Sequence, residues 1–157
     1  MSLQGKVALV TGASRGIGKA IAQQLAAQGA IVIGTATTQA GAEAISTYLQ
    51  ETNAQGLGMT LDVTQADTID DFLAQVQTQF GTPVILVNNA GITKDGLLLR
   101  MKDSDWDAVI NTNLTAIFRL SKACLKGMSK ARWGRIINIS SVVGLMGNAG
   151  QTNYAAA

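Results

Sequence analysis

The sequence contains no histidine, and this absence excludes several kinds of catalytic site. A Ser-His-Asp triad and an imidazole general base both need histidine, and almost every protein zinc site uses it. We therefore expect no metal site. Any acid–base chemistry has to come from tyrosine, lysine, aspartate, glutamate or a bound cofactor.

Cysteine and long hydrophobic runs are also scarce. The single cysteine, Cys124, cannot form a disulfide within the chain, which is typical of a reducing cytoplasm. No apolar stretch is long enough to cross a membrane and no signal peptide precedes the first apolar segment, so we expect a cytoplasmic protein without a membrane partner. With 157 residues, 47% of them hydrophobic and 14% charged, the chain suits one domain with a buried core.

Charge is small in total but unevenly distributed. The net charge is +2, because residues 1–91 carry three basic and six acidic side chains and residues 92–157 carry nine basic and four acidic ones. A basic stripe consists of Arg119, Lys122, Lys126, Lys130, Arg132 and Arg135. Its first four residues are three or four positions apart, which puts them on one side of a helix. It is either a solvated helix face or a landing site for an acidic partner. Nucleic acid is not expected, because no aromatic platform accompanies the stripe.

Strand-like and helix-like patterns alternate and predict an α/β fold, a doubly wound parallel sheet of the Rossmann type. The expected strands are 6–11, 31–35, 57–61, 84–88 and 135–140, and the expected helices are 16–28, 40–51, 66–79 and 104–128. The strands are near-continuous apolar runs, typical of a sheet buried on both faces. Gly29 is expected to end the first helix and Thr64 to cap the third, whose end is marked by Gly81 and Pro83.

After the fifth strand comes a loop with three glycines, then a helical start near Asn153 that stops at Ala157. A half-turn of helix has no stability of its own, and a sheet that ends at its fifth strand leaves an exposed edge and uncovered apolar surface. We therefore expect residues 1–157 to form a single domain that is truncated after the fifth strand, with its C-terminal part missing.

A glycine-rich turn, Thr11-Gly12-Ala13-Ser14-Arg15-Gly16-Ile17-Gly18, joins the first strand to the first helix. Gly12 would make the tight turn, Gly16 would let a pyrophosphate approach, and Gly18 would allow close helix–strand packing. The free N–H groups and the positive dipole end of a helix start favour a bound phosphate. An ordinary turn without a ligand is the alternative, because glycine spacing alone is weakly specific.

The end of the second strand favours NADP over NAD. The segment 34–38, Gly-Thr-Ala-Thr-Thr, has no acidic residue where an NAD site usually carries one for the ribose hydroxyls. Threonine hydroxyls, that of Thr37 among them, can donate to a 2′-phosphate, and Arg15 can supply the opposing charge. Alternatively, these threonines only suit a strand and a helix cap.

Polar and small residues follow the third and fourth strands, at the edge where open α/β sheets bind ligands. Asp62 can accept a hydrogen bond from an adenine amino group, or it can simply form a turn. Ala90 and Gly91 leave room for the adenosine half of a cofactor, and the preceding Asn88 and Asn89 can tie neighbouring loops to the sheet.

In order and spacing, these motifs resemble the short-chain dehydrogenase/reductase family over the whole chain. The matching positions are the glycine-rich turn, Asp62-Val63, Asn88-Asn89-Ala90-Gly91, Asn113, Ser141 and Tyr154. Within that family the closest resemblance is to the bacterial reductases of 3-oxoacyl-[acyl-carrier-protein]. It is carried by residues 34–37, 89–93, 101–103 and 141–157.

The resemblance implies a role for each matching residue. It implies NADPH bound by Gly12, Ser14, Arg15, Gly16, Ile17, Gly18, Thr37, Asp62, Val63, Asn89, Ala90, Gly91 and Tyr154. It also implies ketone reduction, in which Ser141 bonds the developing alkoxide, Tyr154 protonates it and Asn113 holds a water of the proton relay. The family places a lysine four residues after the tyrosine to assist it. Here the sequence ends one position earlier, so we expect the 157-residue polypeptide to lack competent chemistry.

The implied activity is NADPH-dependent reduction of 3-oxoacyl-[acyl-carrier-protein] in fatty-acid biosynthesis. The implied partners are acyl carrier protein, docked on the basic stripe near Arg132, and further copies of the chain in a homotetramer. Two alternatives remain open: a short-chain reductase for another ketone or alcohol, and, if Ala157 is the true C-terminus, a non-catalytic nucleotide-binding module.

Overall fold

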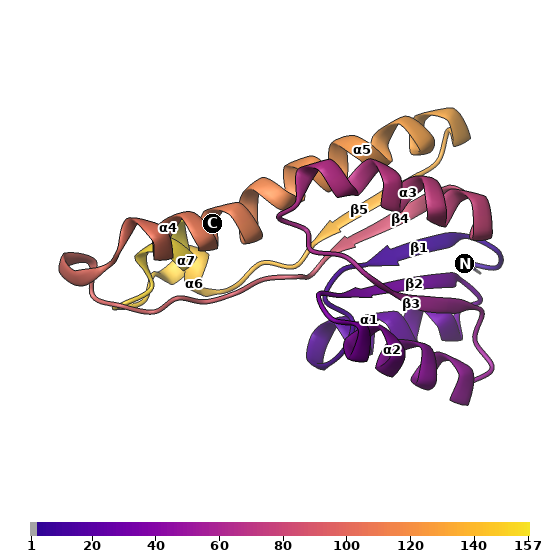
Figure 1. Ribbon diagram of the computed structural model, residues 1–157, viewed down its shortest axis with the longest axis horizontal. Coiled ribbons are helices and arrows are strands. Elements are labelled where there is room, and N and C mark those ends of the chain that lie inside the picture. The colour runs from indigo at the N-terminus through magenta and orange to yellow at the C-terminus, as the bar shows by residue number, and fades with distance from the viewer. Residues whose placement is uncertain (1–2) are drawn as a thin grey trace.

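Five apolar runs form one parallel sheet in the computed structural model, which describes residues 3–157 (Figure 1). The strands are β1 (Val7–Val10), β2 (Ile31–Ala36), β3 (Gly56–Thr60), β4 (Pro83–Asn88) and β5 (Arg135–Asn138), in the order β3-β2-β1-β4-β5. Every neighbouring pair is parallel. This confirms the predicted doubly wound sheet, in which β1 lies at the centre.

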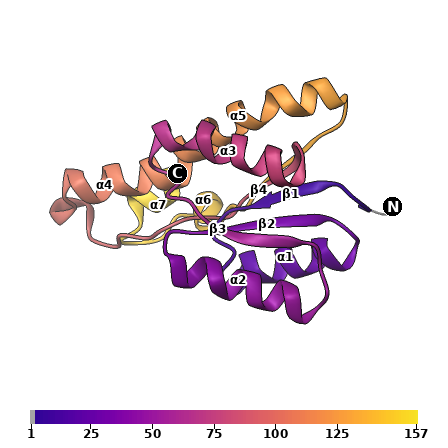
Figure 2. The same ribbon diagram turned by 45° about the vertical axis from the view of Figure 1, so that its right-hand side comes forward.

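Helices cover both faces of the sheet (Figures 1 and 2). Helices α1 (Gly16–Ala27) and α2 (Gln39–Glu51) lie on one face, and α3 (Ala66–Phe80) and α5 (Ala116–Ala131) lie on the other. Side chains of β1 alternate between the two resulting cores because successive residues of a strand point to opposite faces. Val7 and Leu9 pack on the side of α3 and α5, whereas Ala8 and Val10 pack on the side of α1 and α2.

The predicted helix 104–128 is a continuous helical run from residue 103 to 131. It consists of α4 (Asp103–Ile110), the π-helical segment η2 (Asn111–Thr115) and α5. The run is confirmed, but nothing in the sequence pattern predicts its π-helical turn. Such turns occur frequently at functional sites, and this one carries Asn113.

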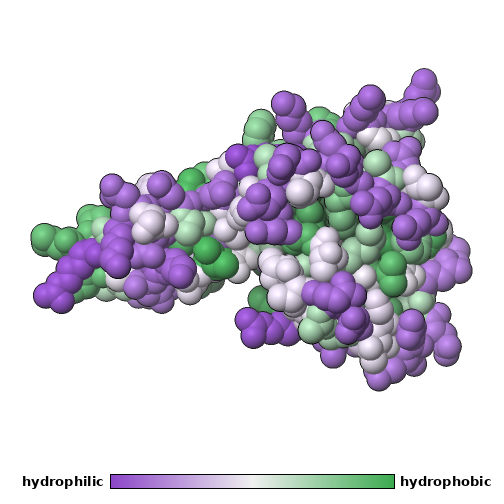
Figure 3. All heavy atoms as spheres, in the orientation of Figure 1, coloured by the Kyte–Doolittle hydropathy of each residue, from purple (hydrophilic) through white to green (hydrophobic). Residues whose placement is uncertain are grey.

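An arm extends beyond the carboxyl edge of the sheet, on the left of Figure 1. It contains η1 (Leu98–Arg100), α4, α6 (Val143–Met146) and α7 (Thr152–Ala156). The amide of Gly96 donates to the carbonyl of Gly150 at 2.8 Å, so the segments after β4 and β5 run together into the arm. Figure 3 shows hydrophobic side chains at its far end. The exposed apolar side chains of η1 and α6 and their flanks include Leu97, Leu98, Leu99, Leu145 and Met146.

The ends of the elements test the predicted caps. Gly29, with φ of 88°, lies just past α1, and Gly81, with φ of 99°, ends α3, so both glycine signals are confirmed. The prediction for Thr64 is wrong: α3 is preceded by Gln65, and the Thr64 hydroxyl donates to Asp62 instead. A carboxylate two residues away competes with the helix end for this hydroxyl.

Strand β5 departs from the prediction of a sheet buried on both faces. All four of its residues are exposed, with Ile136 at 38% and Ile137 at 44%. The reason is its position, because β5 pairs only with β4 among the described residues and forms an edge of the sheet. The expected exposed edge and uncovered apolar surface are therefore present.

Across residues 3–157, no helix combines the length and the apolar character needed to span a bilayer.

Candidate functional site

The glycine-rich turn after β1 folds as its spacing predicts. Gly12 has a φ of 64° and Gly16 a φ of 57°, both in the left-handed region that favours glycine. A Cβ atom on Gly18 would collide with the carbonyl oxygen of Gly12 and crowd the side-chain amide of Asn89. The tight turn at Gly12 and the close helix–strand packing at Gly18 are therefore confirmed.

The start of α1 has no side-chain cap and has open space beside Gly16. Arg15 occupies the N-cap position in an extended conformation, and its side chain makes no capping hydrogen bond. A Cβ atom on Gly16 would meet nothing within 4 Å. The first N–H groups of a helix have no partner within the helix and lie at its positive end. These features suit a phosphate group.

Hydrogen bonds with α2, with β2 and with the segment after β4 hold this turn in place. The Tyr48 hydroxyl of α2 donates to the carbonyl oxygen of Ala13 at 3.0 Å, and the Ala13 amide donates to the Thr35 carbonyl of β2 at 2.9 Å. The Asn89 side-chain amide, just after β4, donates to the carbonyl oxygens of Thr11 and Gly12 at 3.0 Å each. Burial raises the pKa of Tyr48 to about 12, so its hydroxyl keeps the proton that this bond requires.

Thr11 joins the ends of β1 and β4. Its buried hydroxyl accepts hydrogen bonds from the backbone amides of Asn89 and Ala90 at 3.0 Å and donates to the carbonyl of Val87 at 3.3 Å. The side chain of Asn88 donates to that of Asn138 on β5 at 2.8 Å. Asn88 and Asn89 thus tie neighbouring segments together, as expected from the sequence.

A cleft of about 630 Å³ follows the carboxyl edge of the sheet. Every residue expected to bind the cofactor lines it except Tyr154: Gly12, Ser14, Arg15, Gly16, Ile17, Gly18, Thr37, Asp62, Val63, Asn89, Ala90 and Gly91. Further lining residues that sequence analysis did not select include Thr35, Ala36, Leu61, Ile92 and Thr112. A cleft along the sheet edge with an open helix start suits a dinucleotide.

One end of the cleft is shaped by Asp62, Thr37 and Thr38. Asp62 Oδ1 accepts hydrogen bonds from the Thr64 hydroxyl at 2.7 Å and the Thr64 amide at 2.9 Å, which confirms its role in a turn. These bonds lower the pKa of Asp62, the hydroxyl contributing most. Thr38 caps α2 by accepting from the amide of Gly41 at 3.1 Å. The cap interpretation is therefore correct for Thr38, and both Thr37 and Thr38 line the cleft.

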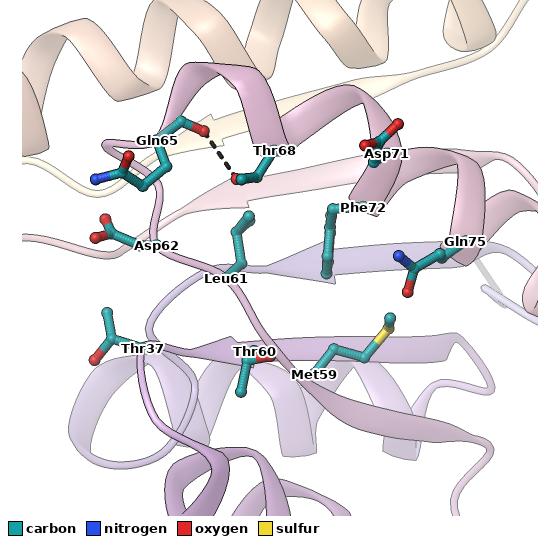
Figure 4. Close-up of a pocket in the computed structure, with 10 residues that line it drawn as sticks. All are labelled: Thr37, Met59, Thr60, Leu61, Asp62, Gln65, Thr68, Asp71, Phe72 and Gln75. Carbon is teal, nitrogen blue, oxygen red and sulfur yellow. Dashed lines mark hydrogen bonds between the residues drawn. The ribbon is translucent and has the colours of Figure 1, made fainter.

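A second hollow of about 450 Å³ adjoins the cleft between β3 and α3 (Figure 4). The two share Thr37, Leu61 and Asp62 as lining residues. In Figure 4, Thr37 and Asp62 lie at one end and the apolar side chains of Phe72 and Met59 lie farther along. The hollow runs from Thr37 and Asp62 back along β3 toward Met59, which pairs with Thr35 of β2, and no sequence motif predicted it.

The residues expected to act on the substrate lie beside the cleft and along the arm. Asn113 Oδ1 accepts from the amide of Ile92, and its Nδ2 donates to the Ile92 carbonyl, both at 2.9 Å. The Ser141 hydroxyl accepts from the amide of Val143 at 3.2 Å. Tyr154 is half-buried on α7, which packs against α4 and α6.

The basic stripe is divided by the fold. Arg119 donates to the Thr64 carbonyl at 3.1 Å and to Asn111 at 3.4 Å, so it links α5 to the cleft edge and to η2. Arg135 lies 5.0 Å from the centre of the Trp133 ring. Lys126, Lys130 and Arg132 are exposed near the end of α5, away from the cleft along the sheet (Figure 1).

Comparison with known sequences agrees with this geometry. Residues 6–157 match the model of the short chain dehydrogenase family, so the chain belongs to that family, which uses a nicotinamide cofactor. The chain is 63% identical to the 3-oxoacyl-[acyl-carrier-protein] reductases FabG of Pseudomonas aeruginosa and Vibrio cholerae and 60% identical to that of Escherichia coli K12. Each alignment covers all of this chain. The chain spans 63–64% of the length of these curated relatives.

Proposed function

We propose that this gene encodes an NADPH-dependent 3-oxoacyl-[acyl-carrier-protein] reductase that acts in fatty-acid biosynthesis in the cytoplasm. The observation that carries the proposal is the cleft, which gathers the residues of the glycine-rich turn, Asp62-Val63 and Asn89–Gly91 at one edge of the sheet. The names of relatives at 60–63% identity support the substrate.

We propose NADPH rather than NADH because of the residues at the end of β2 and in the glycine-rich turn that line the cleft. Arg15 and Thr37 line the cleft together, and the segment from Gly34 to Thr38 contains no carboxylate. Arginine and hydroxyl donors stabilise a 2′-phosphate, whereas a carboxylate there would repel it. Asp62 accepts two hydrogen bonds from Thr64, and in this proposal its role is to accept one from the adenine amino group.

The proposed reaction adds a hydride to the ketone carbon and a proton to its oxygen. The bound cofactor supplies the hydride. Because the Ser141 oxygen accepts from the Val143 amide, its own hydrogen is directed to another acceptor, for which the ketone oxygen is our candidate. Tyr154 gives the proton. Asn113 keeps the loop at Ile92 in place and holds a water of the relay with its remaining hydrogen-bonding capacity.

The test is an assay of the protein expressed from its complete gene, with NADPH and a 3-oxoacyl thioester. We expect oxidation of NADPH, and we expect Tyr154→Phe to reduce kcat at least a hundredfold while NADPH binding persists. Turnover of an unrelated ketone alone would favour the other short-chain reductase. Tight NADPH binding with no turnover of any carbonyl would favour a non-catalytic module.

We propose acyl carrier protein as the partner that delivers the substrate, and the exposed cations Lys126 and Arg132 as its docking site. Charge complementarity to an acidic protein supports this role. Reversal of both residues to glutamate should raise KM for carrier-bound substrate more than for a small thioester, which serves as the internal control. An equal rise for both substrates would contradict docking there.

We also propose a homo-oligomer, with a tetramer as the specific expectation. Leu114, Phe118 and Leu125 are 47%, 63% and 54% exposed along the run from η2 to α5. Their spacing of four and seven residues puts them on one helix face, and an apolar helix face of this kind favours packing against another helix.

A further inference from the structure

Asn153, the residue before Tyr154, is a fully buried polar side chain on the short helix α7. Its exposed fraction is 0%. Its side-chain amide donates to the carbonyl oxygen of Lys94 at 3.0 Å and to that of Asp105 at 3.2 Å. Its side-chain oxygen accepts from the backbone amide of Tyr154 at 2.8 Å. The side chain therefore connects α7, α4 and the segment after β4.

The segment after β4 is held by a second asparagine in the same manner. Asn113 binds both backbone groups of Ile92, and Asn153 binds the carbonyl of Lys94 two residues farther on. The same segment begins with Ala90 and Gly91 in the cleft. The backbone from Ala90 to Lys94 thus connects the cleft with Asn113 and with Asn153, the neighbour of Tyr154.

Helix α7 needs such an anchor, because it is only five residues long and a single helical turn is marginal in water. The hydrogen bond at 3.1 Å from Gln151, the residue before α7, to Asp95 is exposed. Loss of the Asn153 amide would leave the carbonyl oxygens of Lys94 and Asp105 without this donor in a part-buried site. Of these contacts, Asn153 is the buried one and the one next to Tyr154.

We propose that Asn153 is a positioning residue that fixes the proton donor Tyr154 relative to the cleft. The proposal rests on the proposed function insofar as Tyr154 is the proton donor. Proton transfer depends on hydrogen-bond geometry, and a displacement of about 1 Å can cost about a hundredfold in rate. Asn153 itself touches neither substrate nor cofactor in this proposal.

The experiment compares Asn153→Ala with the matched control Asn148→Ala, an exposed asparagine of the same loop, in the protein from the complete gene. We expect Asn153→Ala to lower kcat ten- to a hundredfold with the dissociation constant of NADPH unchanged. Amide hydrogen exchange of residues 152–156, measured without cofactor, should become faster in this variant only. In a Tyr154→Phe background, Asn153→Ala should cause no further loss of kcat.

An unchanged kcat, unchanged exchange of α7, or a full additional loss in the Tyr154→Phe background would overturn the proposal. If Asn153→Ala does not fold, Asn153→Asp keeps the size of the side chain and its acceptor for the Tyr154 amide but replaces the donor, and it should show the same losses. Failure of the proposed substrate is distinguishable, because the same comparison is made with any ketone that the wild type reduces. A wild type that reduces no ketone would overturn both proposals.

Discussion

The Tyr48 hydroxyl donates a hydrogen bond to the carbonyl oxygen of Ala13 at 3.0 Å, across 35 positions of sequence, so helix α2 supports the glycine-rich turn from behind. Tyr48→Phe removes only this donor and leaves the carbonyl without it in a buried site. We expect a loss of about 1–3 kcal/mol in the free energy of unfolding and weaker binding of NADPH. Urea unfolding and fluorescence titration measure the two effects.

A suitable control for that experiment is Thr47→Val, which removes an exposed hydroxyl from the neighbouring position of the same helix. It should leave NADPH affinity unchanged. If Tyr48→Phe bound NADPH as tightly as the wild type, the bond to Ala13 would not contribute to the shape of the cofactor site.

Stability at alkaline pH should reflect two buried neutral groups. Burial raises the pKa of Tyr48 from 10.0 to about 12 and that of Cys124 from 9.0 to about 11. Below pH 9 both groups hold their protons in the folded and the unfolded chain. Above it the unfolded chain loses protons first, so the free energy of unfolding should fall as the pH rises to 12.

Urea unfolding across this pH range provides the measurement. Cys124→Ala should flatten the decline between pH 9 and pH 11, because the thiol no longer contributes. A decline of the same steepness in that variant would show that Cys124 is not the group responsible.

Local signals in the sequence were sufficient to predict the sheet and the position of the cleft at its edge. Apolar runs alternate with helical patterns, and the residues expected to bind the cofactor directly follow strands, so parallel pairing brings them to one edge. The turn of Asp62 was also within reach, because its partner Thr64 is two residues away.

The features that were not predicted depend on contacts between distant segments. Tyr48 and Ala13 are 35 residues apart, and Asn153 and Lys94 are 59 apart, so no periodic pattern relates them. The exposure of β5 was expected for a sheet that ends at its fifth strand, although the apolar residues of β5 by themselves indicate burial on both faces. The π-helical turn at Asn113 has no marker in composition.

Gly18→Ala tests how closely α1 must approach the turn. The added methyl group would collide with the backbone carbonyl of Gly12 and crowd the side chain of Asn89. Neither group can move freely, because the Asn89 amide donates a hydrogen bond to that carbonyl. We expect a loss of about 1–3 kcal/mol in the free energy of unfolding and loss of NADPH binding. Gly96→Ala is the matched control, because a Cβ atom there meets nothing within 4 Å. Wild-type NADPH affinity in Gly18→Ala would contradict this account of the turn.

Arg15→Ala tests the preference for the 2′-phosphate. Because Arg15 lines the cleft with Thr37, its removal should weaken NADPH binding about tenfold or more and NADH binding only slightly. Calorimetric titration with both cofactors makes the comparison within one variant. An equal loss of affinity for NADPH and NADH would show that Arg15 does not bind the 2′-phosphate.

The most direct test of the cofactor site is a crystal structure of the protein from the complete gene with NADP⁺ bound. The account predicts the diphosphate at the open start of α1, between Ser14 and Gly18, and the 2′-phosphate beside Arg15 and Thr37. A cofactor bound outside this cleft, or bound in it with its nicotinamide at the Thr37 end, would contradict the account.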